Sequence, residues 1–485
     1  MNFRFPTTAS LHRCSVLETT AFDFAWQTVG EIATAFAAGR LSAQSVVEAT
    51  FARIRARDPL INSFTAVTAE RAHVHAQALD DARARGEPTP PLAGVPFAVK
   101  NLFDVAGLPT LAGSKINRDA PPASRDATLI ERLEAAGAIL VGALNMGEYA
   151  YDFTGENLHD GPARNPHDRG RMAGGSSSGS AAAVAGGLVP LALGSDTNGS
   201  IRVPASLCGL FGLKPTYGRL SRARTFPFAA SFDHVGPLTR SARDLAIAYD
   251  AVQGYDPDDP VCADRIAEPL TPLLDRGIDG LRIAVAGGYF KCRSAESVYG
   301  VDRVAAALGV NRDIEIPEAE RARSAAYIIT ASEGGSLHLG RLRTRARDFD
   351  PAVRDRLIAG AMLPASLVTK AQKFRRWYRQ EVLKLFAEVD AILAPATPCT
   401  APLLGQQKFI LGDVELPVRA NLGIYTQPIS FIGVPVVVVP VPLSPLPIGV
   451  QIIAAPWRED VALRIAHALE AEGVAAAQRP PIREN

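Results

Sequence analysis

The segment MAGGSSSGSAAAVAGGLVPLALGSDTNGSIRVPASLCGLFGLKPT, residues 172–216, contains two turns rich in Gly and Ser. The first turn precedes a run of alanines that favours helix. The second follows the apolar run Leu188–Leu193, which is typical of a short buried strand. Because glycine adopts the backbone angles of tight bends at low steric cost, each turn offers unpaired N–H groups beside a serine hydroxyl. This combination indicates acyl-transfer chemistry.

Ser200 is the candidate nucleophile, since it ends the second turn, GSDTNGS at 194–200. Consecutive N–H groups before it can hold the oxygen of a tetrahedral intermediate. A serine hydroxyl needs a base to take its proton, and Lys100 ends the apolar run of AGVPFAVKN at 93–101. Burial lowers the pKa of a lysine, and a neutral amine accepts a proton. The pattern therefore predicts a serine hydrolase in which lysine replaces the usual histidine.

The Lys100 segment, the Gly/Ser run, the turn GSDTNGSIR and the spacing of Ser176 from Ser200 together resemble the amidase signature family. The resemblance extends over about residues 28–470. It implies a Ser-Ser-Lys triad, with Ser200 as nucleophile, Ser176 as the bridging serine after a cis peptide bond, and Lys100 as proton acceptor.

The same resemblance implies the oxyanion hole and the fold. The backbone amides of Thr197, Asn198, Gly199 and Ser200 are expected to bind the oxyanion. The expected fold is α/β, a twisted mixed β-sheet between layers of α-helices. Alternation of short apolar runs with helical segments from Pro91 onward is typical of such a sheet.

Within the family, the sequence is most similar to the carboxybiuret hydrolase branch. Asn101 and Asn198 replace the aspartate and glycine of the commoner pattern, and both match that branch. This likeness implies a small, polar, urea-like and anionic amide as substrate, held by an arginine that the sequence does not single out. It also implies a small helical partner chain. The matching stretches are VKNLFD at 99–104, LAGSKINRD at 111–119, NPHD at 165–168, ITASEGG at 329–335 and AAPW at 454–457.

Other polar residues are weaker candidates. Tyr151 and Asn157 are candidate substrate-binding residues, and His338 is a further candidate for the pocket wall. Asp196 and Arg202 flank the nucleophile turn, where a buried ion pair that braces the turn is favoured over direct substrate contact.

The composition excludes several other classes. The chain has 485 residues, 47% hydrophobic and 21% charged, with a formal net charge of +1, so neither nucleic acid nor membrane is an expected partner. Five scattered cysteines lack metal-ligand spacing and suit a reducing cytoplasm. No metal and no organic cofactor is expected. Prolines interrupt the apolar stretch 431–443, which is too short to span a bilayer.

The expected organisation is an N-terminal extension at 1–26, a single amidase domain at 27–475 and a C-terminal tail at 476–485. A mainly helical layer at 289–379 is expected near the site entrance. The first helix is expected to begin at Thr28, because Thr28 and Glu31 form a capping-box pattern.

Three other serine or phosphate motifs fit less well. Residues 175–179 match the G-x-S-x-G elbow with Ser177 as nucleophile, but that motif needs a preceding strand, and the polar segment 165–171 does not predict one. A P-loop would require Lys after Gly179. The β-lactamase pattern would require a lysine three residues after the serine.

Four functions remain open on the sequence. The favoured function is hydrolysis of a small carboxamide or urea-like amide to acid and ammonia through an acyl-enzyme. The alternatives are an A-type subunit of a glutamine-dependent amidotransferase, an aryl- or indole-acetamide hydrolase, and a non-catalytic binding subunit. A homodimer is also open.

Overall fold

The computed structural model describes residues 24–291 and 294–481. Most of the expected extension at 1–26, and the end of the tail at 476–485, lie outside the described residues. Residues 24–26 form a short 3-10 turn. The division of the chain into extension, domain and tail stays a prediction.

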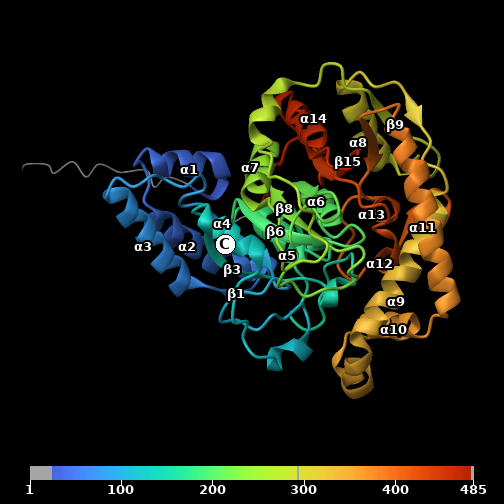
Figure 1. Ribbon diagram of the computed structural model, residues 1–485, viewed down its shortest axis with the longest axis horizontal. Helices are drawn as coiled ribbons and strands as arrows, with labels where there is room; N and C mark the ends of the chain where they lie inside the picture. Colours follow the sequence, from blue (N-terminus) through green and yellow to red (C-terminus); the bar gives the residue numbers. More distant parts are fainter. Residues whose placement is uncertain (1–23, 292–293, 482–485) are drawn as a thin grey trace, which may run out of the picture.

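Within the described residues, eleven strands form one mixed sheet in the order β1-β3-β2-β6-β8-β7-β14-β15-β11-β9-β10 (Figure 1). Mixed α/β architecture is therefore confirmed. The strands of this sheet are β1 Phe64–Val67, β2 Pro96–Lys100, β3 Ile139–Leu144, β6 Leu191–Asp196, β7 Phe211–Lys214, β8 His234–Thr239, β9 Ile283–Ala286, β10 Asp313–Ile314, β11 Ala391–Pro395, β14 Val436–Val441 and β15 Ile448–Ala454.

Helices surround the sheet, with α1 to α3 at one end of the molecule and α9 to α11 at the other (Figure 1). Thr28 caps α1 through the expected capping box. No helix in the described part is long and apolar enough to cross a membrane. The helices are α1 Val29–Ala37, α2 Ala43–Ile61, α3 Ala69–Ala84, α4 Thr128–Ala135, α5 Ser178–Ala185, α6 Arg202–Cys208, α7 Ala242–Val252, α8 Ala295–Ala307, α9 Ala319–Arg345, α10 Pro351–Ala361, α11 Ala365–Leu385, α12 Val418–Asn421, α13 Gln427–Ser430 and α14 Glu459–Ala471.

Strand β2 positions the site, because it pairs in parallel with both β3 and β6. In the β2–β6 ladder Val99 lies opposite Leu193. Parallel strands end at the same edge of a sheet, so the end of β2 and the turn after β6 lie side by side. Two segments about ninety residues apart in the sequence are thereby brought together.

The segment before the Gly/Ser run differs from its prediction. Residues 168–172 form β5, which pairs with β4 Arg164–Asn165 in a small hairpin apart from the central sheet. The Asn165 side chain donates to the carbonyls of Met172 and Leu207, at 3.2 and 2.7 Å. Since most of β5 is exposed, it lacks the apolar alternation by which a strand is found in a sequence. A second hairpin joins β12 Lys408–Leu411 to β13 Val414–Pro417.

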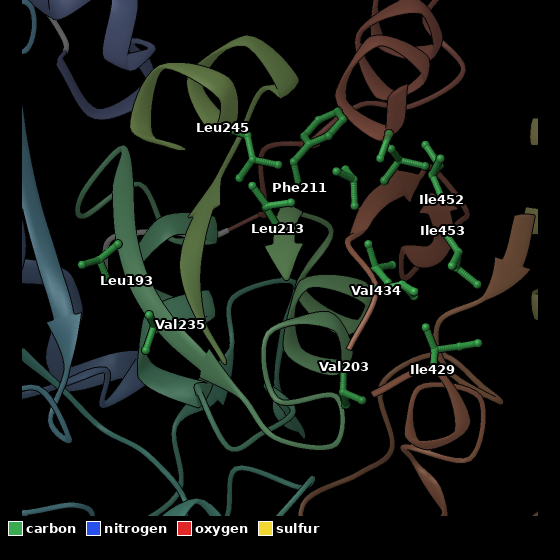
Figure 2. Packing of buried hydrophobic residues seen from close by; sticks show 14 of the residues in the cluster. Leu193, Val203, Phe211, Leu213, Val235, Leu245, Ile429, Val434, Ile452 and Ile453 are labelled. Atoms are coloured by element: carbon green, nitrogen blue, oxygen red, sulfur yellow. The ribbon is translucent and has the colours of Figure 1, made fainter. Parts of the chain in front are cut away.

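The core lies between β6, β7, β8, β14 and β15 and the helices that cover them (Figure 2). One apolar cluster joins the strands around Ser200 to the C-terminal third. It contains Leu193, Val203 and Val235 from the former and Ile429, Val434 and Ile452 from the latter. Close packing on every side leaves the turn after β6 little freedom to move.

Helices α9 and α10 pack closely at glycines, which generates a stability prediction. A Cβ at Gly360 would lie 1.9 Å from the Ala331 carbonyl oxygen. We expect Gly360→Ala to destabilise the fold by about 1–3 kcal/mol, because the two helices must separate. Gly340 on α9 has nothing within 4 Å of its hypothetical Cβ, so Gly340→Ala is the control. It should be neutral or stabilise by up to about 1 kcal/mol. Thermal unfolding followed by circular dichroism compares the two; equal midpoints would contradict the close-packing account.

Candidate active site

Lys100 ends β2 and its amine lies among three serine hydroxyls. Nζ donates to Ser176 Oγ at 2.6 Å, to Ser195 Oγ at 2.8 Å and to Ser177 Oγ at 3.1 Å. All four residues are buried. Three acceptors satisfy the three donors of an ammonium group, and a neutral amine can instead accept a proton from one of the hydroxyls.

Burial lowers the pKa of Lys100 to about 7, because the charged ammonium is removed from water. The negative charges of Asp196 and Asp233 act in the opposite direction and offset only part of this effect. Near neutral pH a large fraction of the amine is therefore uncharged and able to act as a base.

The two neighbouring serines of the first turn occupy different positions. The peptide bond between Gly175 and Ser176 is cis. Ser177 Oγ donates to the Ser195 carbonyl at 3.1 Å and accepts from the Ser195 N–H at 3.2 Å. Ser177 is thus held by internal hydrogen bonds and is absent from the pocket that contains Ser200. This placement disfavours the elbow motif.

Ser200 lies in a small pocket, and the N–H groups before it are unpaired. Within 24–291 and 294–481, the backbone amides of Thr197, Asn198, Gly199 and Ser200 donate to no protein acceptor. Four buried unpaired N–H groups in succession are rare, because each costs desolvation energy without a partner. Their clustering at a serine hydroxyl supplies the donors that an oxyanion requires.

The turn before Ser200 is held in place by Thr426. Gly199 has a φ of 141°, and a Cβ there would lie 2.1 Å from Thr426 Oγ1. Thr426 Oγ1 donates to the Asn198 carbonyl at 2.7 Å. Asn198 is not among the residues with positive φ, so its side chain adds no backbone strain.

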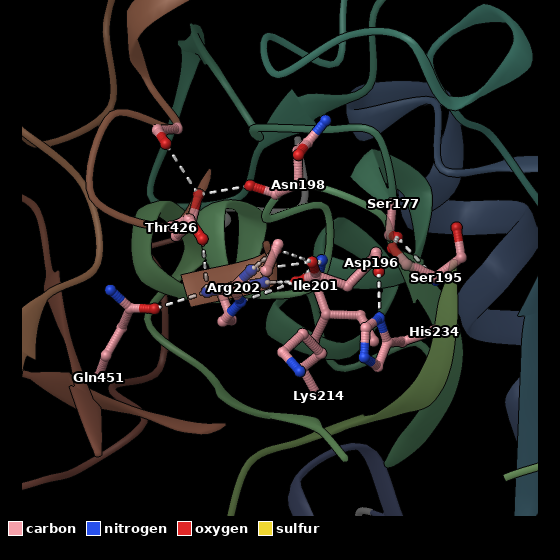
Figure 3. A network of polar contacts seen from close by, with 12 residues as sticks. Ser177, Ser195, Asp196, Asn198, Ile201, Arg202, Lys214, His234, Thr426 and Gln451 are labelled. Atoms are coloured by element: carbon pink, nitrogen blue, oxygen red, sulfur yellow. Dashed lines mark hydrogen bonds and ion pairs between the residues drawn. The ribbon is translucent and has the colours of Figure 1, made fainter. Parts of the chain in front are cut away.

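A buried ionic network lies beneath the turn (Figure 3). Arg202 Nε and Nη2 donate to the two carboxylate oxygens of Asp196 at 2.9 and 3.0 Å, and both side chains are fully buried. Burial would raise the pKa of Asp196, but the Arg202 guanidinium holds it well below its usual range. The predicted structural ion pair is confirmed. Arg202 also donates to Gln451 Oε1, at 2.7 Å, and to the Thr426 carbonyl, at 3.1 Å.

The pocket walls come from five separate parts of the chain. Tyr151 lines the pocket as expected, while Asn157 and His338 are not among its lining residues. The walls are Tyr151, Phe153, Phe228, Tyr327, Arg356 and Gln427.

Asn157 and His338 have other surroundings. Asn157 Nδ2 donates to the carbonyls of Gly113 and Met146, both at 2.7 Å, and its Oδ1 accepts the N–H groups of His159 and Asp160. These four hydrogen bonds hold the surrounding loop and occupy the side-chain amide of Asn157. The His338 ring lies 4.0 Å from the Tyr149 ring, and burial lowers its pKa to about 3.

Arg356 and Gln427 were not found from the sequence, because neither lies in a motif. Arg356 Nη2 donates to the Tyr151 carbonyl and Nε donates to the Ala352 carbonyl. Its guanidinium lies 4.0 Å from the Tyr151 ring centre. Among the described residues no carboxylate pairs with Arg356. It is therefore a cation at the pocket wall with an unpaired Nη1.

A metal cluster and a second groove are the other places where a functional site could lie. In the described residues, no group of three or more His, Cys, Asp or Glu side chains could hold a metal ion. A wider groove lies between the start of α9 and the β12–β13 hairpin, lined by Tyr289, Glu320 and Leu416. It contains none of the serines or the lysine described above, so the small pocket at Ser200 is the candidate active site.

The fold and the pocket combine a buried lysine, a serine hydroxyl and four unpaired backbone amides. Residues 45–463 match the family model described as Amidase. The chain therefore belongs to the amidase family and is a hydrolase that acts on amide C–N bonds.

The chain is similar to proteins that cover nearly all of it. It is 54% identical, over 92% of its length and 98% of the relative's, to AtzE, which is part of the 1-carboxybiuret hydrolase of Pseudomonas sp. (strain ADP). It is 40% identical, over 91% of its length and 96% of the relative's, to the A-type subunit of the glutamyl-tRNA(Gln) amidotransferase of Azotobacter vinelandii.

Solved structures are also similar to this chain over nearly its whole length. One, described as a vestigial protein complex that reveals the evolutionary origins of an s-triazine catabolic enzyme, has a TM-score of 0.92 at 54% identity, covering 93% of this chain and 100% of its own. The A-type subunit of the glutamyl-tRNA(Gln) amidotransferase from Thermotoga maritima has a TM-score of 0.78 at 30% identity, covering 96% of this chain and 97% of its own.

The depressed pKa of Lys100 generates a prediction that needs no substrate. Between about pH 7 and the ordinary lysine pKa of about 10.4, the unfolded chain binds one proton more at this position than the folded chain. Lys100 should therefore make the free energy of unfolding rise with pH in this window. Lys100→Met removes that contribution. Lys214 has a similarly lowered pKa and is present in both proteins, so its effect cancels.

The measurement is thermal or urea unfolding of both proteins at several pH values from 6 to 10. The wild-type protein should gain stability relative to Lys100→Met as the pH rises. A difference that does not change with pH would show that the amine is not held neutral in the folded protein.

Proposed function

We propose that the chain hydrolyses a small amide through a Ser-Ser-Lys triad and an acyl-enzyme. The observation that carries this proposal is the row of unpaired amides at 197–200, next to Ser200 and at the strand edge where Lys100 binds Ser176 at 2.6 Å. A binding subunit without catalysis would have no use for a buried neutral amine at this position.

The proton path runs from Ser200 to Ser176 and then to Lys100. Neutral Nζ accepts the Ser176 proton while Ser176 Oγ accepts the Ser200 proton, and Ser200 Oγ attacks the amide carbonyl. The amides at 197–200 bind the oxyanion. Reversal of the path protonates the leaving nitrogen, which departs as ammonia or an amine, and water attacks the acyl-enzyme through the same groups.

One contact of this path forms only during the reaction. The Ser200 hydroxyl donates to no protein group in the described part of the chain, whereas the Ser200 carbonyl accepts the Ser177 N–H at 3.3 Å. The proposal requires the Ser200 hydroxyl to turn toward Ser176 when substrate binds. Catalytic hydrogen bonds commonly tighten when substrate binds.

Ser200→Ala should lower the rate of amide hydrolysis by several orders of magnitude, because it removes the only atom that forms the acyl bond. Ser177→Ala is the matched control: it removes a hydroxyl at the same lysine but outside the proposed path. Ammonia release from a small amide measures both. An organophosphonate should label wild-type protein and Ser177→Ala but not Ser200→Ala. Near-normal turnover by Ser200→Ala would refute the assignment.

The substrate class follows from the pocket and from the relatives. Arg356 offers an unpaired guanidinium nitrogen to a carboxylate at the pocket wall. The relative at 54% identity is a hydrolase of 1-carboxybiuret, which carries a carboxylate beside urea-like amides. We infer that carboxybiuret or a similar small anionic amide is the substrate and that Arg356 is the arginine that binds its carboxylate.

Arg356→Met should raise KM for an anionic amide such as malonamate by about tenfold or more, since a charged hydrogen bond contributes about 1.5–3 kcal/mol. The neutral malonamide should change little. Arg354→Met on the same helix is the control, because Arg354 pairs with Asp355 and lies outside the pocket. If Arg356→Met raised KM equally for malonamate and malonamide, Arg356 would only maintain the shape of the pocket and would not bind a carboxylate.

A component of a glutamine amidotransferase is the second candidate, favoured by the 40% identity to such a protein. Hydrolysis of small amides by the isolated chain, without ATP or tRNA, separates the two functions. Aryl- and indole-acetamides belong in the same screen. Tyr151 and Phe228, whose ring centres lie 4.6 Å apart, would contact an aromatic group in this pocket.

A small helical partner chain belongs to this proposal as well. The support is the solved relative described as a protein complex. Size-exclusion chromatography with light scattering distinguishes a complex with such a chain from a homodimer. A cytoplasmic location is supported by Cys208, Cys262 and Cys399, which are free thiols.

A further inference from the structure

Gln427 lines the pocket and has an unpaired donor. Its Oε1 accepts a hydrogen bond from Arg323 Nε at 2.9 Å. A guanidinium cannot accept, so this bond fixes which end of the amide is oxygen. Nε2 is buried and has no hydrogen-bond partner among the described residues. Gln427 is fully buried and lines the same pocket as Ser200.

Arg323 is itself held in place. Its Nη2 donates to Asn421 Oδ1 at 2.7 Å and to the Ala420 carbonyl at 2.9 Å. The Gln427 side chain therefore cannot turn over without breaking a bond to a fixed cation. An unpaired buried amide N–H₂ costs free energy unless a ligand or water accepts from it.

Asn198 lines the same pocket and has an unpaired acceptor. The Thr330 hydroxyl donates to the Ala326 carbonyl at 2.8 Å, so it accepts from Asn198 Nδ2 at 3.4 Å. Asn198 Oδ1 is then the free end, and it is buried without a partner in the described part of the chain. Figure 3 shows the Asn198 side chain directed away from the buried Asp196–Arg202 pair.

We infer that Gln427 and Asn198 together bind a second amide unit of the substrate, next to the bond that is cleaved. Gln427 Nε2 donates to the carbonyl oxygen of that unit, and Asn198 Oδ1 accepts from its N–H. Substrates with adjacent amide units, such as acylureas, satisfy both groups. A simple monoamide leaves both unpaired. This inference rests on the proposed function, because it assigns the specificity of the same pocket.

The experiment compares biuret, which has two urea-like carbonyls, with butyramide, which has one. Both are neutral, so Arg356 and any added charge in the pocket affect them alike. Gln427→Glu keeps an oxygen for Arg323 and replaces the donor with an acceptor. Asn198→Gly removes the acceptor and keeps the backbone amide. Gln407→Glu is the control, because Gln407 is exposed and lies outside the pocket.

We expect each pocket variant to lower kcat/KM for biuret by about 10- to 100-fold, since a buried carbonyl or N–H of the substrate loses its partner. kcat/KM for butyramide should fall much less, so each variant should lower the ratio of kcat/KM for biuret to kcat/KM for butyramide by about tenfold or more. The control should match the wild-type protein for both amides. Unfolding midpoints measured on each variant separate loss of specificity from loss of fold.

The outcomes separate this inference from the proposed function. Equal losses for both amides, or no loss for either, would overturn the assignment of Gln427 and Asn198 while leaving the triad intact. Wild-type turnover of butyramide without turnover of biuret would overturn it too. Amide turnover that survives Ser200→Ala would instead overturn the proposed function, on which the inference depends.

Discussion

The burial of the Lys100 amine is the constraint on which the site depends. A lysine amine in water at neutral pH is charged and cannot accept a proton. The parallel pairing of β2 with β3 and β6 places the Lys100 amine in the interior, where its pKa falls to about 7. Three serine hydroxyls satisfy its hydrogen bonds in either charge state. Two of these serines come from the turn before α5 and the third from β6, so the helix start and the strand edge must meet at the amine. The large sheet thus serves mainly to fix one polar group where water cannot reach it.

The turn at 197–200, the proposed oxyanion site, requires a different kind of support. Its amides are useful only if they remain unpaired, so no neighbouring carbonyl can approach them, and the turn must be held by its other groups. Thr426 binds the Asn198 carbonyl, the Gly199 carbonyl accepts the Val203 N–H at 2.7 Å, and the Asp196 carboxylate accepts the Ile201 N–H at 3.2 Å. Arg202 ties the same carboxylate to Gln451 and to the segment around Thr426. The C-terminal third therefore stabilises the turn before Ser200 through Thr426 and Gln451. This explains why the fold needs nearly the whole chain.

The sequence predicted those parts of the site that a local pattern specifies. A lysine at the end of an apolar run and a serine after a glycine turn are local features, and so is the Asp196–Arg202 brace. The pocket walls are not local: Arg356 lies on a partly exposed amphipathic helix, and Gln427 follows Thr426 in a stretch without periodicity. Asn157 was a candidate for the pocket, yet its four hydrogen bonds brace a loop instead. Only the tertiary contacts show whether such a side-chain amide lines a pocket or holds a loop in place. The exposed strand β5 was not predicted, because it has polar residues on both faces and therefore no alternation of polar and apolar residues.

The charges beneath the site also explain how a neutral lysine and an ionised aspartate coexist nearby. The Asp196 carboxylate raises the pKa of Lys100, but by less than burial lowers it. Arg202 pairs with the same carboxylate, and the opposite charges of such a pair partly cancel at a distance. Lys214 and His234 lie in the same network (Figure 3), and burial lowers the pKa of each, so both carry less positive charge near neutral pH than they would in water. Desolvation remains the dominant influence on the Lys100 amine, and it keeps a large fraction of that amine uncharged near neutral pH.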